Sequence, residues 1–454
     1  MEELSRKLIK IIKDKNLNRY LMNCNFGLEK ENVRVDENGA MALTPHPKVF
    51  GDRLKNPYIK TDFSESQVEM ATPICHTIDE TYDSLENIHD VVSLEIKNEY
   101  LWPGSNPPIL PDEKDIPIAK MGDRYEEEFR VNLSKKYGSK KQTISGIHYN
   151  FSFSDEFLEK LYDEFKENES FREFKDEIYL KICRNFLKYR WFLIYMTGAS
   201  PVFHESFIKD YVSKRYLFKD MISLRNSDYG YKNTENFYIS FDSVHDYVYD
   251  IDKLVKSKKL QDICEFYGPA RLKTGNDDNL SYELLEYGIK YIELRIFDLN
   301  PLFKIGISKD ILYLTHLFVL YMLFMNDSIF KSDDGNIADK NSNLTCMYGR
   351  KNDLELYESP DKKILLKSKA EDILNGIKNM LEILNIHDEK FSSMIKKCED
   401  KILNLKKTFA AQIADMIQKE SYVGFHMNRA KNYLKESLKS GINLAACDYI
   451  SKNG

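Results

Sequence analysis

Three short segments of this chain alternate apolar and polar residues with the two-residue period of a β-strand. Each carries two polar side chains at positions i and i+2, namely Glu29 and Glu31, His148 and Asn150, and Glu293 and Arg295. Such a pair points to one face of the strand, about 7 Å apart. The alternate positions are apolar, with Ile147, Tyr149, Phe151 and Phe153 in the second segment and Ile292, Leu294 and Ile296 in the third. Glu, His, Asn and Arg on the polar face predict a site built on a sheet surface rather than a solvated exterior.

The rest of the pattern predicts an α+β chain. Strands are expected at 26–35, 59–72 with a bend, 142–153, 265–272 and 288–298. Helical periodicity covers 1–20, 80–98, 123–137, 155–196 and 243–258, and continues from 307 onward with a Gly-, Asn- and Asp-rich break at 332–350. The segment 101–117 contains five prolines and is expected to be irregular. No repeat or linker marks a domain boundary.

Composition is typical of a globular protein and excludes some partners. Hydrophobic residues make up 42% of the 454 residues, and the net charge of −6 leaves no basic excess to neutralise nucleic-acid phosphates. The N-terminus does not have the pattern of a signal peptide, and the apolar run at 311–325 is too short for a membrane span. The seven cysteines are scattered without a CxxC motif, which suits reduced cytosolic thiols. We expect a cytoplasmic monomer without a nucleic-acid or membrane partner.

Acidic residues on or beside the expected strands indicate cation chemistry. They are Glu29, Glu31, Asp62, Glu65, Glu69 and Glu293, accompanied by His148. Mg²⁺ prefers oxygen ligands, and several such ions can clamp a transferring phosphoryl group. The chain has no P-loop, GxGxxG, HExxH or GxSxG motif, so nucleotide chemistry would use a different scaffold. Arg295 shares the face of Glu293 and suits bidentate contact with phosphate.

Plainer interpretations of these residues stay open at this point. The carboxylates can form a solvated rim, Glu293 and Arg295 a surface ion pair, and His148 an ordinary hydrogen-bonded histidine. Arg130 is spaced to pair with Glu126 on a helix, which is worth about 0.3 kcal/mol.

The sequence singles out four further positions, Arg225, Tyr231, Tyr267 and Gly146. Arg225 lies near a turn, where an arginine often binds a substrate carboxylate. Tyr231 and Tyr267 either line a pocket or belong to the core. Gly146 has no side chain, so a ligand can approach the backbone there.

Several of these segments, taken in order, resemble the bacterial type of glutamate–cysteine ligase (γ-glutamylcysteine synthetase). They are GLEKENVR at 27–34, TDFSE at 61–65, QTISGIHYNFS at 142–152 and YIELR at 291–295, with LWP at 101–103, TGASP at 197–201 and DLNP at 298–301. The resemblance implies the glutamine synthetase-like fold, in which a curved, mainly antiparallel sheet forms an open funnel surrounded by helices. It also implies a single catalytic unit over 1–454, with a sheet-containing core at 1–306 and a mainly helical region at 307–454 packed on it.

The resemblance implies an ATP-dependent, ADP-forming carbon–nitrogen ligase. ATP phosphorylates the γ-carboxylate of L-glutamate, and the amine of L-cysteine displaces phosphate to give γ-glutamylcysteine, the first step of glutathione synthesis. Two or three Mg²⁺ ions, for which Mn²⁺ can substitute, bridge ATP and the forming acyl phosphate. The implied partners are therefore small molecules.

Site residues follow by motif match. The implied metal ligands are Glu29, Glu31, Asp62, Glu69, His148 and Glu293, so the resemblance prefers Glu69 to Glu65. Arg295 is implied to contact phosphate, Arg130 to lie near the transferred phosphoryl group, and Arg225 to bind a substrate carboxylate. Ile144 and Asn150 belong to the implied glutamate pocket. The implied cysteine pocket is lined by Phe63, Leu133, Gln142, Tyr231 and Tyr267.

Two departures from the family pattern bear on the acceptor. Phe129 stands where Tyr is expected, and Cys264 where Asn is usual, both near the implied cysteine pocket. One alternative is therefore a γ-glutamyl ligase for another amine. Two other classes also stay open, a phosphotransferase that joins no amine and a sensor without catalysis. A fused relative that makes glutathione itself carries an added ATP-grasp domain, for which 454 residues are expected to leave no room.

Overall fold

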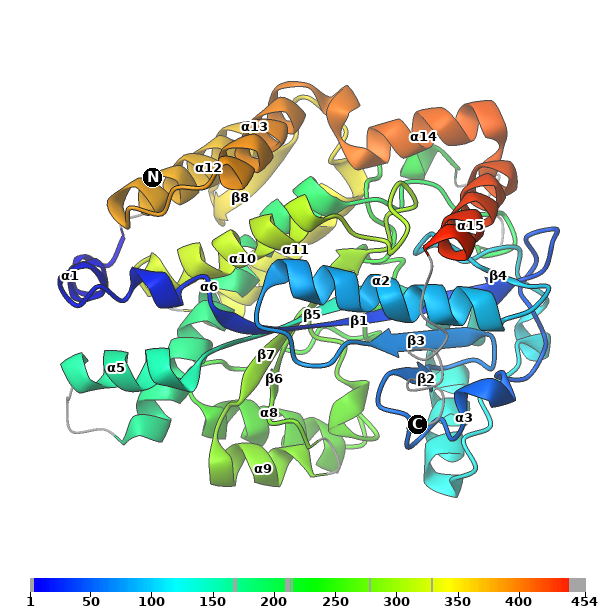
Figure 1. Cartoon of the computed structure of the whole chain (residues 1–454), viewed down its shortest axis with the longest axis horizontal. Coiled ribbons are helices and arrows are strands. Elements are labelled where there is room, and N and C mark those ends of the chain that lie inside the picture. The colour runs from blue at the N-terminus through cyan, green and yellow to red at the C-terminus, as the bar shows by residue number, and fades with distance from the viewer. Residues whose placement is uncertain are drawn as a thin grey trace.

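The structure, a computed structural model, describes residues 4–440 except 166–169, 209–212, 214, 277–278 and 328–329. The strands of its main sheet are β1 (Cys24–Val35), β2 (Ile59–Thr61), β3 (Gln67–Ala71), β4 (Tyr100–Leu101), β5 (Gly146–Phe153), β6 (Ala270–Lys273) and β7 (Tyr291–Asp298). Their spatial order is β2-β3-β1-β5-β7-β6, and β4 pairs with the end of β1 (Figure 1). All these pairings are antiparallel and the sheet is open. The predicted α+β class with a mainly antiparallel sheet is therefore confirmed.

Three helices pack on the apolar face of the sheet: α2 (Ile78–Glu95), α6 (Phe171–Thr197) and α10 (Lys309–Phe324), the last through the ring of His316 on Phe26 and Phe151. Phe26, Phe151 and Leu294 from the strands share one buried core with these helices. From Ile311 to Phe324, every residue of α10 except the partly exposed Tyr313 is buried. This burial explains why the helix carries apolar residues on all sides rather than along one stripe. Burial of this face leaves the opposite, polar face of the sheet for other contacts.

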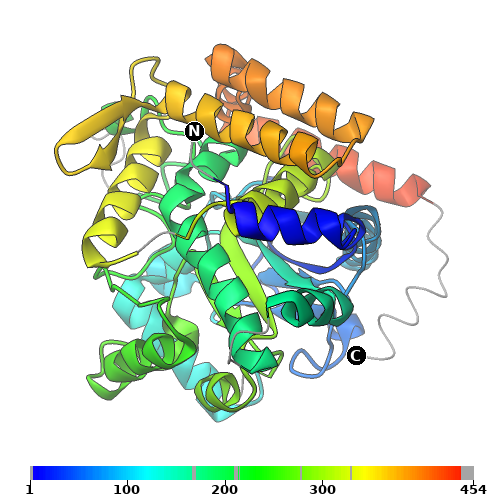
Figure 2. The ribbon, with the colours of Figure 1, turned by 90° about the vertical axis from the view of Figure 1, so that its left-hand side faces the viewer.

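The remaining helices surround this core. Before residue 300 they are α1 (Arg6–Asp14), α3 (Arg124–Tyr137), α4 (Ser139–Gln142), α5 (Asp155–Phe165), α8 (Val244–Lys256) and α9 (Leu280–Tyr287). Towards the C-terminus they are α11 (Ser332–Tyr348), α12 (Leu366–Ile383), α13 (Glu389–Leu403), α14 (Phe409–Glu420) and α15 (Tyr422–Lys439), with a hairpin of β8 (Glu355–Ser359) and β9 (Lys362–Leu365). Short 3₁₀ turns are η1 (Asn18–Tyr20), η2 (Lys48–Phe50), η3 (Glu113–Asp115), η4 (Arg215–Phe218), η5 (Ile263–Glu265) and η6 (Leu405–Lys407). Figure 2 shows α12 and α13 as an outer layer, and both pack on α10.

The structure corrects four sequence predictions. The expected break at 332–350 is wrong, because α11 is a helix there. Its weak helix formers are held by packing on α6 and by Asn341, whose amide bonds the backbone of Tyr357. Gln142 ends α4 instead of beginning a strand, and β5 starts at Gly146. The strand expected at 265–272 is confined to β6, since Glu265 belongs to η5. The β8–β9 hairpin interrupts a region expected to be helical.

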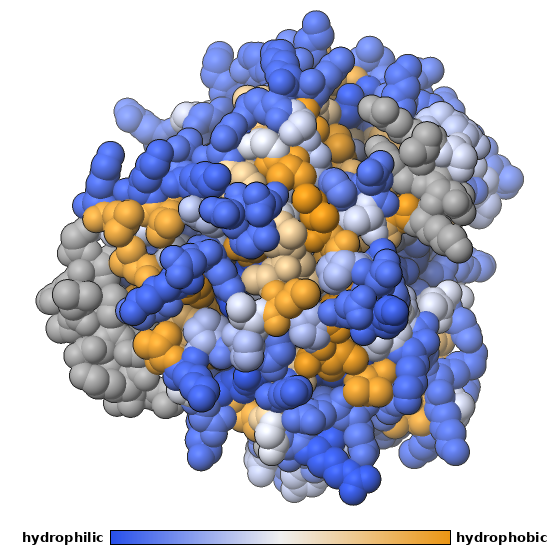
Figure 3. Space-filling view, turned by 90° about the vertical axis from the view of Figure 1, so that its right-hand side faces the viewer, coloured by the Kyte–Doolittle hydropathy of each residue, from blue (hydrophilic) through white to orange (hydrophobic). Residues whose placement is uncertain are grey.

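The predicted positions of the other strands are confirmed. β1, β7 and the bent pair β2–β3 lie where the two-residue period placed them. Within the described ranges no helix has the length and apolar character of a membrane span. Five cysteines in these ranges are buried and form no disulfide, namely Cys24, Cys75, Cys183, Cys346 and Cys398, whereas Cys264 is exposed. Cys447 lies outside the described residues. The side of the molecule drawn in Figure 3 is mostly hydrophilic, with apolar residues scattered between polar ones.

Candidate active site

The sheet register brings the predicted polar residues together. Glu29 on β1 lies opposite His148 on β5, and Asn150 lies opposite Glu293 on β7. On the other side of β1, Glu31 lies opposite Glu69 on β3. Cross-strand partners point to the same face, so four neighbouring strands contribute to one polar surface.

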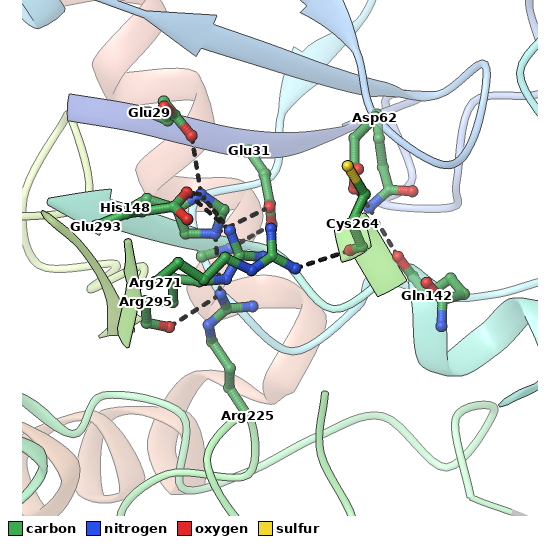
Figure 4. Close-up of polar contacts among 12 residues, drawn as sticks. Glu29, Glu31, Asp62, Gln142, His148, Arg225, Cys264, Arg271, Glu293 and Arg295 are labelled. Atoms are coloured by element: carbon green, nitrogen blue, oxygen red, sulfur yellow. Dashed lines mark hydrogen bonds and ion pairs between the residues drawn. The ribbon is translucent and has the colours of Figure 1, made fainter. Parts of the chain in front are cut away.

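His148 is at the centre of this surface (Figure 4). Its Nδ1 atom is 3.0 Å from Oε2 of Glu29 and 3.2 Å from Oε1 of Glu293, and its Nε2 atom is 3.6 Å from Oε1 of Glu31. A register shift in the β5–β7 pairing beside Tyr149 accompanies this arrangement. Ligand atoms of Glu29, His148 and Glu293 all lie within 4.8 Å of one another, as the ligands of one metal ion would.

The donor set fits a hard cation. Carboxylate oxygens predominate, and Oε2 of Glu293 is buried with no hydrogen-bond partner among the described residues. Oε2 of Glu31 accepts a hydrogen bond from the backbone N–H of Gly146 at 2.9 Å, which fixes that carboxylate. The second oxygen of Glu29 accepts from Nδ2 of Asn150 at 2.9 Å. These bonds orient the carboxylates, as the outer contacts of metal ligands do.

Charge pairing favours ionised groups at the centre. Burial raises the pKa of Glu29, but the hydrogen bond and charge of His148 leave it below its usual value. Burial also opposes ionisation of Glu293, yet the charges of Arg295 and His148 hold its pKa well below normal. Burial and Arg295 act to lower the pKa of His148, and the two carboxylates outweigh them and raise it.

Two outer carboxylates are electrostatically crowded. Burial, together with the charge of Glu31, raises the pKa of Asp62 to about 6. Burial and the charges of Glu29 and Asp62 raise the pKa of Glu69 to about 7. Like charges gathered this closely are stabilised by a cation. All six predicted metal ligands therefore lie in one acidic cluster.

Three predicted arginines border the cluster. Arg295 donates from Nη1 to Oε1 of Glu293 at 2.8 Å. Arg130 forms the predicted pair with Glu126 at 2.6 Å and also donates from Nε to the backbone oxygen of Asp62 at 2.8 Å. The plain helix-pair interpretation of Arg130 is thus correct but incomplete, because the same side chain contacts the cluster.

Of these three arginines, Arg225 alone has buried N–H groups without a hydrogen-bond partner among the described residues. Its Nη2 atom lies 3.5 Å from Nε2 of His148 and donates to the backbone oxygen of Arg295 at 3.3 Å. Nε and Nη1 are buried without a hydrogen-bond partner among the described residues. The guanidinium lies over the ring of Tyr231, 5.4 Å from its centroid. A buried guanidinium with free donors fits an anionic ligand.

An apolar cluster adjoins the polar surface. It contains the buried Phe63, Leu133 and Ile144, with Tyr231, Tyr267 and Phe129 packed against them. Tyr267 donates its hydroxyl hydrogen to Oε1 of Gln142 at 3.2 Å. The residues expected to line the acceptor pocket therefore belong to this cluster or, in the case of Gln142, bond to one of its members, although they come from separate segments.

A cavity of about 140 Å³ lies beside the arginines and tyrosines of the site, and no member of the acidic cluster lines it. Its lining includes Arg225, Tyr231, Tyr267 and Arg295. A ligand in this cavity would contact both the cations and the aromatic rings.

Glu65 is not part of the site. Its carboxylate accepts hydrogen bonds from Arg53 and from the backbone N–H groups of His46 and Lys120. It therefore holds two loops together, and the expectation that it belongs to the acidic set is wrong.

Two cations of β6 were missed by sequence reasoning. Arg271 lies opposite Glu293, and the charge of Lys273 lowers the pKa of both Glu29 and Glu293. They show the same i, i+2 spacing as the predicted pairs, which was a usable signal. It was obscured because the strand was expected to begin five residues too early, at Glu265.

Comparison with known proteins decides the family. A family model described as glutamate-cysteine ligase matches residues 9–345. This chain belongs to the glutamate–cysteine ligase family. Among curated relatives, the glutathione biosynthesis bifunctional protein GshAB of Clostridium perfringens is 50% identical over 98% of this chain, but over 58% of its own length. The glutamate–cysteine ligase of Clostridium acetobutylicum is 32% identical, covering 94% of this chain and 98% of its own.

Solved structures agree with this membership. The glutamate–cysteine ligase of Francisella tularensis, in complex with AMP, matches with a TM-score of 0.87 at 25% identity, covering 95% of this chain and 92% of that one. The bifunctional glutathione synthetase of Pasteurella multocida gives a TM-score of 0.86 at 31% identity, covering 98% of this chain and 58% of that one. The chain thus spans a little over half the length of its bifunctional relatives in the ligase family.

Proposed function

We propose that this chain joins the γ-carboxylate of L-glutamate to the amine of L-cysteine at the expense of ATP. A γ-carboxylate oxygen attacks the terminal phosphorus of ATP, ADP leaves, and an acyl phosphate forms. The cysteine nitrogen then attacks the acyl carbon, loses a proton, and displaces inorganic phosphate to give γ-glutamylcysteine. The observation that carries the proposal is the acidic cluster around His148 with Arg225 and Arg295 beside it on one sheet face.

Each group of residues has a role in this proposal. Glu29, Glu31, Asp62, Glu69, His148 and Glu293 would hold two or three Mg²⁺ ions, with Mn²⁺ as a substitute. Held by these residues, Mg²⁺ would supply positive charge that offsets the charge of the phosphate oxygens. Arg130 and Arg295 stabilise negative charge that develops on the phosphoryl group, and losing such a contact costs about 10²-fold in turnover.

Substrate recognition is assigned to the neighbouring groups. Arg225 binds a substrate carboxylate with its unpartnered N–H groups. Asn150, whose Oδ1 is buried without a partner among the described residues, and Ile144 belong to the glutamate pocket. The acceptor side consists of Phe63, Leu133, Gln142, Tyr231 and Tyr267.

The proposal also retains the remaining sequence expectations. The helical region 307–454 would form one catalytic unit with residues 1–306, in keeping with a buried core shared by both. The chain would act on small molecules as a cytoplasmic monomer, without a nucleic-acid or membrane partner.

A γ-glutamyl ligase for a different amine is the second candidate. It is favoured by Cys264 and Phe129, where the family pattern has other residues.

One experiment separates the cysteine ligase from a ligase for another amine. The purified chain is given Mg²⁺, ATP and L-glutamate, with and without L-cysteine, and phosphate and product mass are measured. Cysteine-dependent phosphate release with γ-glutamylcysteine supports the first candidate, whereas turnover with another amine alone supports the second. Phosphate transfer that needs no amine would indicate a phosphotransferase, and no turnover with any amine would refute both ligases.

A further inference from the structure

Glu265 is a carboxylate buried completely beside the proposed acceptor pocket. Its Oε1 atom accepts a hydrogen bond from the hydroxyl of Tyr137 at 2.6 Å and forms an ion pair with Lys136. Its Oε2 atom accepts from the backbone N–H of Gln261 at 2.6 Å. A buried carboxylate is tolerated when it is paired in this way. Glu265 thereby ties the C-terminal turn of α3 to the segment that precedes Tyr267.

Asn233 continues this connection to Tyr267. Its Nδ2 atom donates to the hydroxyl of Tyr137 and to the backbone oxygen of Glu265, each at 2.9 Å. Its Oδ1 atom accepts from the backbone N–H of Tyr267 at 3.0 Å. An amide side chain offers donors and an acceptor together, which neither Asp nor a hydrophobic residue does. Asn233 therefore fixes the backbone of Tyr267 relative to α3.

The aromatic rings depend on this anchoring. The ring centroid of Tyr267 is 4.3 Å from that of Tyr231 and 5.4 Å from that of Tyr137. Both Tyr231 and Tyr267 line the cavity next to Arg225 and Arg295. Both stand on loops outside the sheet. The backbone N–H of Tyr267 is held by Asn233, and that of Tyr231 donates to the backbone oxygen of Arg225 at 2.9 Å.

Arg271 gives the same segment a second attachment, to the sheet. Its guanidinium donates to the backbone oxygens of Cys264 and Phe266 (Figure 4). Since Arg271 lies opposite Glu293 in the register, the anchored segment stays aligned with the acidic cluster.

We propose that Glu265 and Asn233 are positioning residues that fix the Tyr231–Tyr267 pair as the wall of the acceptor pocket. They would set affinity for the acceptor amine without contacting ATP or the γ-carboxylate of glutamate. The inference rests on the proposed function and adds to it the residues that hold the acceptor side in place.

The test compares Asn233→Ala and Glu265→Gln with the wild type. Both variants are expected to raise KM for cysteine about tenfold, the loss of one or two buried hydrogen bonds. KM for glutamate and for ATP should stay within about twofold, because the altered bonds lie on the acceptor side. The acyl phosphate is measured separately with hydroxylamine, a small nucleophile whose nitrogen attacks the acyl carbon and releases phosphate. Hydroxamate formation should stay close to that of the wild type.

Asn185→Ala is the matched control. Asn185 is also buried, and its Nδ2 atom donates to the backbone oxygens of Met322 and Asn326, away from the site. This variant should lower the melting temperature as Asn233→Ala does, yet leave every KM unchanged. The inference is wrong if Asn185→Ala raises KM for cysteine as much as Asn233→Ala does. It is also wrong if Asn233→Ala and Glu265→Gln change the KM values for cysteine, glutamate and ATP alike, because Glu265 and Asn233 would then have a merely structural role.

Tyr137→Phe covers the case in which Asn233→Ala does not fold. It removes one hydroxyl that bonds both Glu265 and Asn233, and it should raise KM for cysteine about threefold. An unchanged KM in the folded variant overturns the inference. If the wild-type enzyme couples cysteine and the variants keep the wild-type KM for cysteine, this inference is wrong but the proposed function stands. A wild-type chain that couples no amine refutes the proposed function as well.

Discussion

The guanidinium of Arg225 lies directly against the backbone of Gly146. A Cβ atom at position 146 would stand 2.2 Å from Cζ of Arg225, far inside van der Waals contact. Gly146 begins the strand that carries His148, so this approach also places Arg225 beside the acidic cluster. The sequence predicted room for a ligand at the backbone of Gly146, but the structure places the side chain of Arg225 there.

Gly146→Ala should therefore displace Arg225 and impair substrate binding. We expect kcat/KM for glutamate to fall about a hundredfold, because contacts of a charged donor are worth about 2–3 kcal/mol. Steady-state kinetics with glutamate as the varied substrate measures this. Gly335→Ala is the control, since the nearest atom to its added Cβ is at 3.4 Å. That helical substitution should leave kinetics unchanged and add about 0.5–1 kcal/mol of stability. Normal kinetics in folded Gly146→Ala would contradict the assignment of Arg225.

Sequence periodicity was sufficient to predict which residues share a face. Glu29 with Glu31, and Glu293 with Arg295, follow from the two-residue period of a strand. The pairing of Glu29 with His148 does not, because register depends on which strands become neighbours and on the irregularity in the β5–β7 pairing. A local pattern therefore identifies the residues of this site but not their contacts.

Long-range contacts explain the errors. The composition of α11 disfavours a helix, and its packing on α6 outweighs that tendency. Glu65 and Glu69 are both acidic residues near β3, and the polar pattern alone did not separate them, whereas the family resemblance preferred Glu69. The carboxylate of Glu65 is held outside the acidic cluster by hydrogen bonds from Arg53 and from two backbone N–H groups, donors that lie 12 to 55 positions away along the chain.

Metal binding gives a direct test of the acidic cluster. His148→Ala removes the group whose Nδ1 contacts both Glu29 and Glu293, and it should weaken Mn²⁺ binding by at least about tenfold. Electron paramagnetic resonance titration without nucleotide measures this independently of turnover. His204→Ala is the control, because His204 is half-buried and bonds Ser206 outside the cluster. Equal Mn²⁺ affinity in the two variants would count against a metal site here.

Asp176 should make stability fall as pH rises. Burial raises its pKa from 3.8 to about 6, so the native state binds this proton more tightly than the unfolded state does. Its contribution to stability is fully present below pH 4 and is lost as pH rises through 6. Asp176→Asn keeps an oxygen to accept the hydrogen bond from the backbone N–H of Ile289. We expect the variant to be more stable than the wild type by about 2 kcal/mol at pH 8 and equal to it near pH 4.

Asp79 is the control of opposite sign. Hydrogen bonds, first that from Tyr313, lower its pKa to about 2. The contribution of Asp79 to the stability of the fold is present above pH 4 and is lost as pH falls through 2. Asp79→Asn should therefore be less stable than the wild type at pH 7. Urea unfolding over a pH series measures both variants. If Asp176→Asn loses stability at pH 8, burial does not dominate at that position.

The two carboxylates near β3 provide the last test, because the structure gives them opposite tasks. Glu65→Gln loses the ion pair with Arg53 and weakens acceptance from two backbone N–H groups, so it should cost about 2 kcal/mol of stability while turnover persists. Glu69→Gln removes a charge that Glu29 and Asp62 repel, so its stability should be equal or higher. Turnover should nevertheless fall by at least about a hundredfold, since a metal ligand is lost. Thermal unfolding and the phosphate-release assay on both variants decide the matter. An active Glu69→Gln together with an inactive but stable Glu65→Gln would reverse the assignment and return Glu65 to the acidic set.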